Sequence, residues 1–152
     1  PSARQAAPYD RTMATLLAHI TVRPGSEAEF EELARTLSER THATETGVRR
    51  YEYWRGSEPR SYYTLLAFDD HRAFIAHQTS DHHEAASPQL GGLVERLRLE
   101  WLDPVEGACE LLSTEMQPAA TGADDLTVAY TARFAAVIAD WWMPLRHPTT
   151  TS

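Results

Sequence analysis

Residues His19–Phe30 read HITVRPGSEAEF and join three structural signals in one stretch. The apolar end of a strand runs into a Pro-Gly turn. Ser26 followed by Glu29 then forms a capping-box pattern, which predicts that a helix begins there. Its apolar residues recur at helical spacing, at Phe30, Leu33, Ala34 and Leu37. A strand that leads directly into an amphipathic helix predicts an α+β domain in which this helix packs on a sheet.

The same kinds of pattern continue on both sides of this stretch. Period-two alternation and helix start signals predict these elements: a strand over 15–22, a helix from Ser26 to about 41–44, strands over 48–55 and 62–68, a helix from Asp69-Asp70 to Gln78, a helical segment from Ser80 that Pro88 and Gly91-Gly92 interrupt, and a strand over 96–102. This order is β-α-β-β-α-β, the ferredoxin-like arrangement.

Such a sheet carries helices on one face only, so its other face is bare in a monomer. Leu17, Leu65 and Ala67 would face water there. Two sheets packed face to face would cover this surface, and we therefore expect a homodimer built as a dimeric α+β barrel.

The chain has 152 residues, and the ferredoxin-like unit accounts for about 13–105. We expect residues 1–12 to be an N-terminal extension or a cloning remnant, because Met13-Ala14-Thr15 resembles a natural start. Residues 106–152 form a C-terminal extension, with a strand expected over 109–116, a linker over 117–125 and an amphipathic helix over 126–142. This helix would pack on its own domain or on the partner chain, or act as a lid.

Composition narrows the class of protein. The net charge is −8 with scattered carboxylates, which argues against binding to nucleic acid. No apolar run is long enough to cross a membrane. The single cysteine, Cys109, cannot form an internal disulfide, so we expect a reducing, cytoplasmic location. All fourteen basic residues are arginine, and the chain contains no asparagine.

The inner face of the predicted sheet and the second helix suggest a pocket with one titratable group. His77 follows Phe74 by three residues, so both side chains lie on the same side of their helix. An imidazole titrates near neutral pH, which suits a general base, and the Thr64 hydroxyl would orient a substrate oxygen. His82 is expected at the pocket mouth. The expected substrate-binding set is Ala18, Thr64, Leu66, Phe68, Phe74 and His82. The alternative is that His77 only packs against the next helix start.

The histidines of this region can also be interpreted as a metal cluster. His71, His77, Asp81, His82 and His83 lie close in sequence, and His77 and Asp81 are one helical turn apart. Zinc sites usually place their histidines at tighter, repeated spacings, and no H-E-x-x-H motif is present. We therefore expect no metal site. His19 lies on the face of its strand opposite Ala18 and is interpreted as structural or interfacial.

Several motifs in this order resemble the antibiotic biosynthesis monooxygenase family, over about Met13 to Val105. They are Val22-Arg23-Pro24-Gly25 with Glu29-Phe30, Glu45-Thr46-Gly47-Val48 before Tyr51-Glu52, Ala67-Phe68-Asp69-Asp70, and Ala76-His77 followed by Ser80-Asp81-His82. The resemblance implies a dimeric α+β barrel with a pocket inside each subunit, and many members need no metal, flavin or haem. Haem-degrading relatives carry an Asn and a Trp where this chain has Ala18 and Phe68, and they share only the histidine, at His77. Haem degradation is therefore not expected.

The resemblance and the pocket together predict a cofactor-independent monooxygenase. It would use O2 to oxidise a phenolic, quinol or anthrone-like aromatic, and the resemblance implies a place in specialised, antibiotic-type metabolism. The expected partners are a second copy of the chain, a small aromatic substrate and O2. One alternative is a non-catalytic barrel that binds a hydrophobic small molecule. Another is a pathway cyclase or isomerase that uses His77 for proton transfer.

Overall fold

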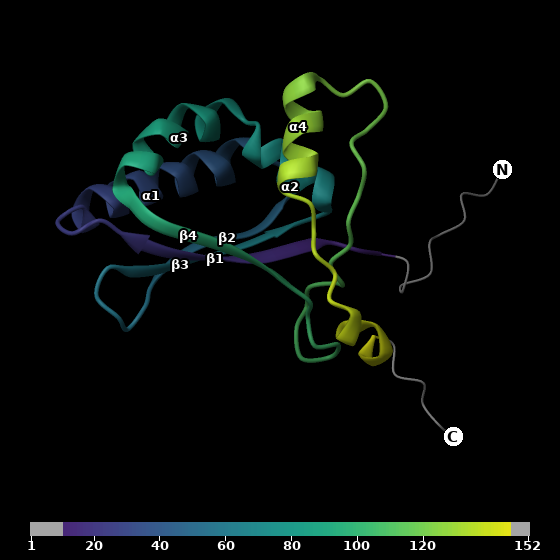
Figure 1. The fold of residues 1–152 in the computed structure, drawn as a ribbon. Coiled ribbons are helices and arrows are strands. Elements are labelled where there is room, and N and C mark those ends of the chain that lie inside the picture. The colour runs from purple at the N-terminus through teal and green to yellow at the C-terminus, as the bar shows by residue number, and fades with distance from the viewer. Residues whose placement is uncertain (1–10, 147–152) are drawn as a thin grey trace.

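The computed structural model describes residues 11–146, and it confirms the α+β, ferredoxin-like architecture. Its elements are β1 (Ala14–Val22), α1 (Glu27–Thr44), β2 (Val48–Arg55), β3 (Ser61–Phe68), α2 (His71–Gln78), α3 (Asp81–Leu93), β4 (Val94–Leu102), α4 (Asp125–Arg133) and the 3-10 helix η2 (Asp140–Leu145). The four strands form one antiparallel sheet in the order β2-β3-β1-β4. All four α-helices lie on one face of this sheet (Figure 1).

The core lies between the sheet and these helices. Strand β1 occupies an inner position and alternates as its sequence predicts, with Leu16, Ala18, Ile20 and Val22 buried. Helix α1 buries Phe30, Leu33 and Leu37 against this face. No helix within residues 11–146 has both the length and the apolarity to span a bilayer.

The turn between β1 and α1 forms where the sequence predicts it, but the capping box does not. Gly25 adopts φ +81°, a left-handed conformation that glycine tolerates without a steric penalty. Ser26 occupies the N-cap position, yet its side chain makes no capping hydrogen bond. Its backbone amide instead donates to the Arg23 carbonyl, which closes the turn.

Helix α3 is longer than predicted. It continues from Asp81 to Leu93 and passes through Pro88, Gly91 and Gly92 without a break. A proline inside a helix removes one amide-to-carbonyl bond. Pro88 is exposed, so water can satisfy the carbonyl that the missing amide leaves free.

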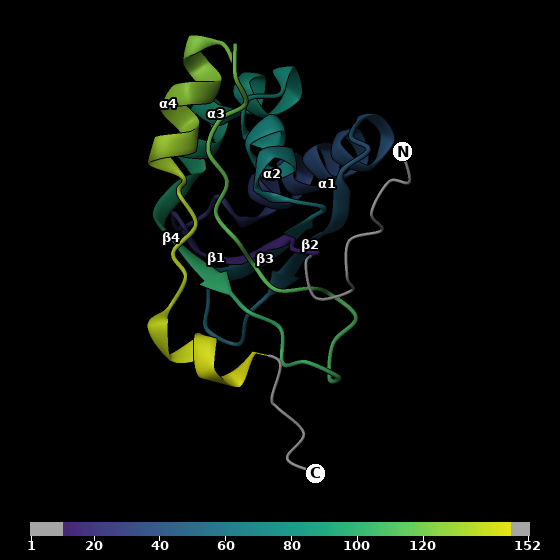
Figure 2. The ribbon, with the colours of Figure 1, turned by 90° about the vertical axis from the view of Figure 1, so that its right-hand side faces the viewer.

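The C-terminal extension differs most from its prediction. No strand forms over 109–116 in the part of the chain that the structure describes. Thr114 makes only an isolated bridge to Met13. The helix expected over 126–142 ends at Arg133, and η2 follows after an irregular stretch. Figure 2 shows this stretch running from α4, past the edge of the sheet at β4, toward η2. The last three residues of the expected helix therefore lie in a separate element.

The second face of the sheet is only partly open. Leu17 and Leu65 are register partners at its centre, and both are half-buried. Ala67 is fully buried, contrary to the expectation that it would face water. Ala67 pairs with Thr15, whose amide donates to the Thr114 hydroxyl, so the C-terminal extension reaches this end of the sheet.

Candidate functional site

A cavity of about 460 Å³ lies between the inner face of the sheet and the helices. Five of the residues predicted for the site line it together: Ala18, Thr64, Leu66, Phe74 and His77. The strands supply the first three, and α2 supplies Phe74 and His77 on one side of the helix. The helical spacing of Phe74 and His77 thus gives the arrangement that the sequence predicts.

The two other predicted residues lie elsewhere. Phe68 is fully buried behind the cavity, with its ring centroid 5.6 Å from that of Phe74 and 5.2 Å from that of His77. His82 contacts Glu45, and its neighbour His83 lines the cavity in its place. Because each residue of a helix is rotated by about 100° from the one before, adjacent histidines at the start of α3 point in different directions.

His77 is fully buried, and its two ring nitrogens have different surroundings. Nδ1 lies 2.8 Å from Oε2 of Glu45. Nε2 has no hydrogen-bond partner within residues 11–146. A carboxylate only accepts hydrogen bonds, so it holds the proton of a neutral imidazole on Nδ1 and leaves the lone pair on Nε2. This arrangement places a free proton acceptor beside the cavity.

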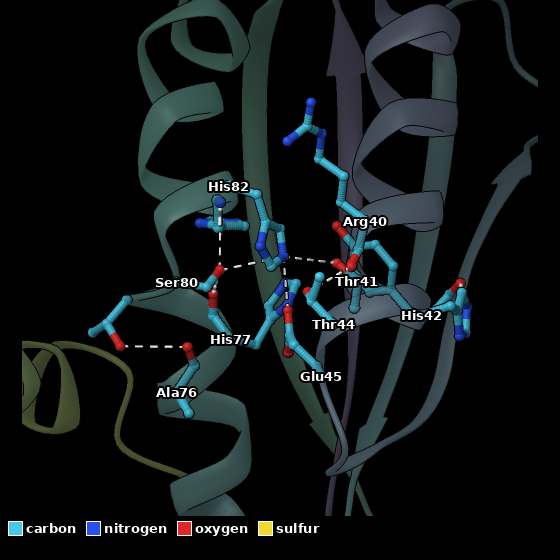
Figure 3. Close-up of polar contacts among 12 residues, drawn as sticks. Arg40, Thr41, His42, Thr44, Glu45, Ala76, His77, Ser80 and His82 are labelled. Carbon is cyan, nitrogen blue, oxygen red and sulfur yellow. Dashed lines mark hydrogen bonds and ion pairs between the residues drawn. The ribbon is translucent and has the colours of Figure 1, made fainter.

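Glu45 is a candidate site residue that the sequence patterns do not indicate. It follows the last residue of α1, and its Oε2 also lies 2.8 Å from Nε2 of His82. Figure 3 shows this carboxylate between the two imidazoles. Gly47 lets the segment after α1 lie close to α2, because a Cβ atom at Gly47 would be only 2.7 Å from Cβ of Ala73 on α2. The motif Glu45-Thr46-Gly47-Val48 was recognised only as a marker of the fold.

Two tyrosines bring hydroxyl donors to the same cavity. The hydroxyls of Tyr51 and Tyr53 lie 2.8 Å apart and share one hydrogen bond. Burial raises the pKa of Tyr51 and raises that of Tyr53 to about 12, so both phenols keep their protons at neutral pH. The Thr64 hydroxyl lies on the adjacent strand, where Thr64 is the register partner of Tyr53. These groups can donate hydrogen bonds to an anionic oxygen in the cavity.

His83 is a second imidazole on the cavity wall. Burial first, and then the nearby His77 and His82, together lower the pKa of His83 to about 4. His83 is therefore neutral at pH 7. Its ring centroid lies 4.9 Å from that of His77.

Helix α4 closes one side of the cavity, with Tyr130 and Phe134 among the lining residues. The Tyr130 hydroxyl donates to Glu84 on α3 over 2.6 Å, and Nε2 of His71 donates to the Phe134 carbonyl over 3.0 Å. Phe134 leaves the helical conformation to make this contact. Part of the C-terminal extension thus forms a wall of the cavity.

One group of side chains has the geometry of a metal-ligand set. One atom each from Glu45, His77 and His82 lies within 4.8 Å of the other two. His77 and His82 belong to the histidine-rich segment in which the sequence suggests metal ligands. The third member, Glu45, comes from outside that segment. Within residues 11–146, no other such group of histidine, cysteine and carboxylate side chains occurs.

A larger hollow, of about 600 Å³, lies between the loop after β4 and η2. Trp141 and Trp142 line it, with the ion pair of Arg146 and Asp103 at its edge. It contains no histidine, so it offers no group comparable to His77.

The fold and the cavity define a ferredoxin-like α+β protein with a largely apolar pocket and a histidine–carboxylate pair whose histidine is fully buried. The chain belongs to the antibiotic biosynthesis monooxygenase family, whose sequence model matches residues 13–89. This membership supports a monooxygenase-like function.

Solved structures agree with the assignment. A protein of Caulobacter crescentus, provisionally named an antibiotic biosynthesis monooxygenase, is 29% identical with a TM-score of 0.60, over 64% of this chain and 94% of its own. A Pseudomonas aeruginosa protein is 25% identical with a TM-score of 0.56, over 60% and 92%. A protein of Bacteroides thetaiotaomicron, 19% identical with a TM-score of 0.61 over 66% and 96%, shows the fold alone. No curated protein matches the chain significantly.

Proposed function

We propose that this protein is a homodimeric, cofactor-independent monooxygenase that oxidises a phenolic, quinol or anthrone-like aromatic with O2. The observation that carries the proposal is the buried His77, whose Nε2 is unpaired beside the cavity while Nδ1 is held by Glu45. His77 acts as the general base that removes a proton from the bound aromatic.

The chemistry requires an electron-rich anion. Ground-state O2 is a triplet and reacts slowly with closed-shell molecules, but a phenolate or an anthrone anion can transfer one electron to it directly. When an anthrone-type CH2 becomes a carbonyl, one oxygen atom enters the product and the other leaves as water. The substrate supplies all the electrons, so the reaction needs no external reductant.

The remaining cavity residues suit the same reaction. Ala18, Leu66 and Phe74 provide apolar walls, which reduce the contact of the anion with water. Tyr51 and Tyr53 are protonated donors, and together with the Thr64 hydroxyl they can hold the negative oxygen as charge develops. Such an oxidation requires a general base, hydrogen-bond donors for the anion and an apolar pocket.

The test is oxygen uptake by the full chain with a panel of quinols and anthrones, after treatment with a chelator. We expect turnover by the wild type, and a loss of about 10²- to 10⁴-fold in kcat for His77→Gln. His19→Gln is the matched control, because His19 also contacts a glutamate, Glu100, but on the opposite face of the sheet. It should keep wild-type activity.

Two other outcomes would redirect the assignment. Conversion of substrate without O2 would mean that His77 performs proton transfer for an isomerisation or cyclisation. Thermal stabilisation by these aromatics without any turnover would mean that the cavity serves binding alone. Equal turnover by the wild type and by His77→Gln would show that His77 is not the base.

A further inference from the structure

Three separate helices bring Glu45, His77 and His82 to one point. Glu45 follows the end of α1, His77 lies in the last turn of α2, and His82 lies in the first turn of α3. Oε2 of Glu45 is 2.8 Å from Nδ1 of His77 and 2.8 Å from Nε2 of His82. Side chains so far apart in sequence converge on a volume of atomic size (Figure 3).

The surroundings of His82 contain more acceptors than its proton can satisfy. Its Nε2 lies 2.8 Å from Oε2 of Glu45, 3.2 Å from the Thr41 hydroxyl and 3.3 Å from the Ser80 hydroxyl. The Ser80 hydroxyl already donates to the His77 carbonyl over 2.7 Å. A ring nitrogen carries at most one proton. Three oxygens thus lie within 3.3 Å of one ring nitrogen, and one of them is a carboxylate oxygen that only accepts.

We propose that Glu45, His77 and His82 bind Zn²⁺, or a divalent transition ion of similar preference, and that the bound ion disables the base of the proposed oxidation. Two imidazoles and one carboxylate suit zinc, whereas calcium and magnesium prefer oxygen ligands alone. Zinc bonds of 2.0–2.2 Å put neighbouring ligand atoms roughly 3.0–3.4 Å apart. Oε2 of Glu45 lies 2.8 Å from each imidazole nitrogen, and all three atoms lie within 4.8 Å of one another.

Charge and access favour the same ion. With neutral imidazoles, Glu45 supplies one partly buried negative charge that a dication would compensate. The His77 side chain is fully buried, while those of Glu45 and His82 are 14% and 11% exposed. Two of the three ligands are therefore in contact with solvent, and neither of them lines the substrate cavity.

The consequence for the reaction follows from the nitrogen that the ion uses. A metal on Nδ1 of His77 takes that lone pair, so the imidazole must carry its proton on Nε2. His77 then presents an N–H donor to the cavity in place of a lone pair. It can no longer accept the proton of the substrate. This switching effect rests on the proposed function, whereas binding of the ion does not.

Zinc binding can be measured without any substrate. The full chain, freed of metal with a chelator and dialysed, is titrated with ZnCl2 in competition with a chromophoric chelator. We expect one Zn²⁺ per chain with a Kd of about 1 µM or tighter. Glu45→Gln and His82→Gln should each weaken binding at least tenfold. His19→Gln should bind as the wild type does, because the pair of His19 and Glu100 includes no second imidazole.

Circular dichroism checks that each variant is folded, and Co²⁺ bound to the wild type gives a second reading through its visible d–d absorption. The site is wrong if the wild type binds no stoichiometric Zn²⁺, or if neither substitution weakens binding. The switch is wrong if zinc-saturated protein turns over as fast as metal-free protein. Failure of the proposed oxidation would appear separately, as no turnover by the metal-free wild type.

Discussion

Glu45 contacts His77 at Nδ1 alone, and by accepting a hydrogen bond there it determines that the lone pair of a neutral imidazole is on Nε2. Glu45→Gln keeps the shape of the side chain and removes its charge. We expect kcat to fall about 10- to 100-fold, equivalent to about 1.4–2.7 kcal/mol in the barrier. KM should hardly change, since Glu45 does not line the cavity.

Glu39→Gln is the control, because Glu39 is an exposed carboxylate on the same helix. A steady-state comparison of kcat and KM checks the expectation. If Glu45→Gln raised KM and left kcat unchanged, Glu45 would act on substrate binding and the proposed orientation of His77 would be wrong.

The sequence predicts the cavity residues better than the contacts behind them. Phe74 and His77 share a helical face, and that spacing is visible in the sequence. Glu45 is 32 residues from His77, so no local pattern relates the two. Contrary to the prediction, His82 does not lie at the cavity, and the reason is a different one. The rotation of α3 is fixed by its packing, and it turns His83 toward the cavity and His82 toward Glu45.

At the scale of elements, Glu31 fastens α1 to the hairpin of β2 and β3. Its carboxylate accepts hydrogen bonds from Arg55, over 2.9 Å and 2.6 Å, and from the Tyr62 hydroxyl over 2.6 Å. These bonds, that from Arg55 first, lower the pKa of Glu31 to about 2. The folded state thus holds the ionised form more strongly than the unfolded chain does.

The sign of the pH effect follows from this lowered pKa. The stabilising contribution of Glu31 is complete above the ordinary pKa of 4.5 and is lost as the pH falls from there toward 2. We expect the urea midpoint of the wild type to decrease between pH 5.5 and 3. The decrease should be smaller in Glu31→Gln, and in high salt, which screens the exposed Arg55. Identical pH profiles for the two proteins would contradict the assignment.

Strands such as β1 and β3 were predictable because one face of each packs on the core. Apolar residues therefore recur at every second position of their sequences. The C-terminal helix was not predictable in this way. Its apolar pattern continues past Phe134, but the chain leaves the helix there and the Phe134 carbonyl meets His71. A tertiary contact therefore ends α4 where the local pattern would continue it. The same limit applies to α3, in which packing carries the helix through Pro88.

At the scale of the whole molecule, the open face of the sheet is where we expect the second copy to pack. Leu17 and Leu65 lie side by side at its centre, with Glu100 opposite Leu17 and Glu52 opposite Leu65 on the flanking strands. An apolar centre with charged flanks is typical of a surface that pairs with itself across a two-fold axis. The helices occupy the other face, so the cavity of each copy would remain separate from this interface.

Leu65→Glu tests this arrangement directly. In a dimer the substitution would bury two carboxylates near the two-fold axis without partners, which costs several kcal/mol. We therefore expect the wild type to sediment as a dimer and Leu65→Glu to sediment as a folded monomer at micromolar concentration. Thr36→Glu adds the same charge to an exposed position on α1 and should remain dimeric. Because His77 and its cavity lie on the helical side, the monomeric variant should still bind aromatic ligands. A wild type that sediments as a monomer, or a Leu65→Glu variant that stays dimeric, would exclude the sheet face as the interface.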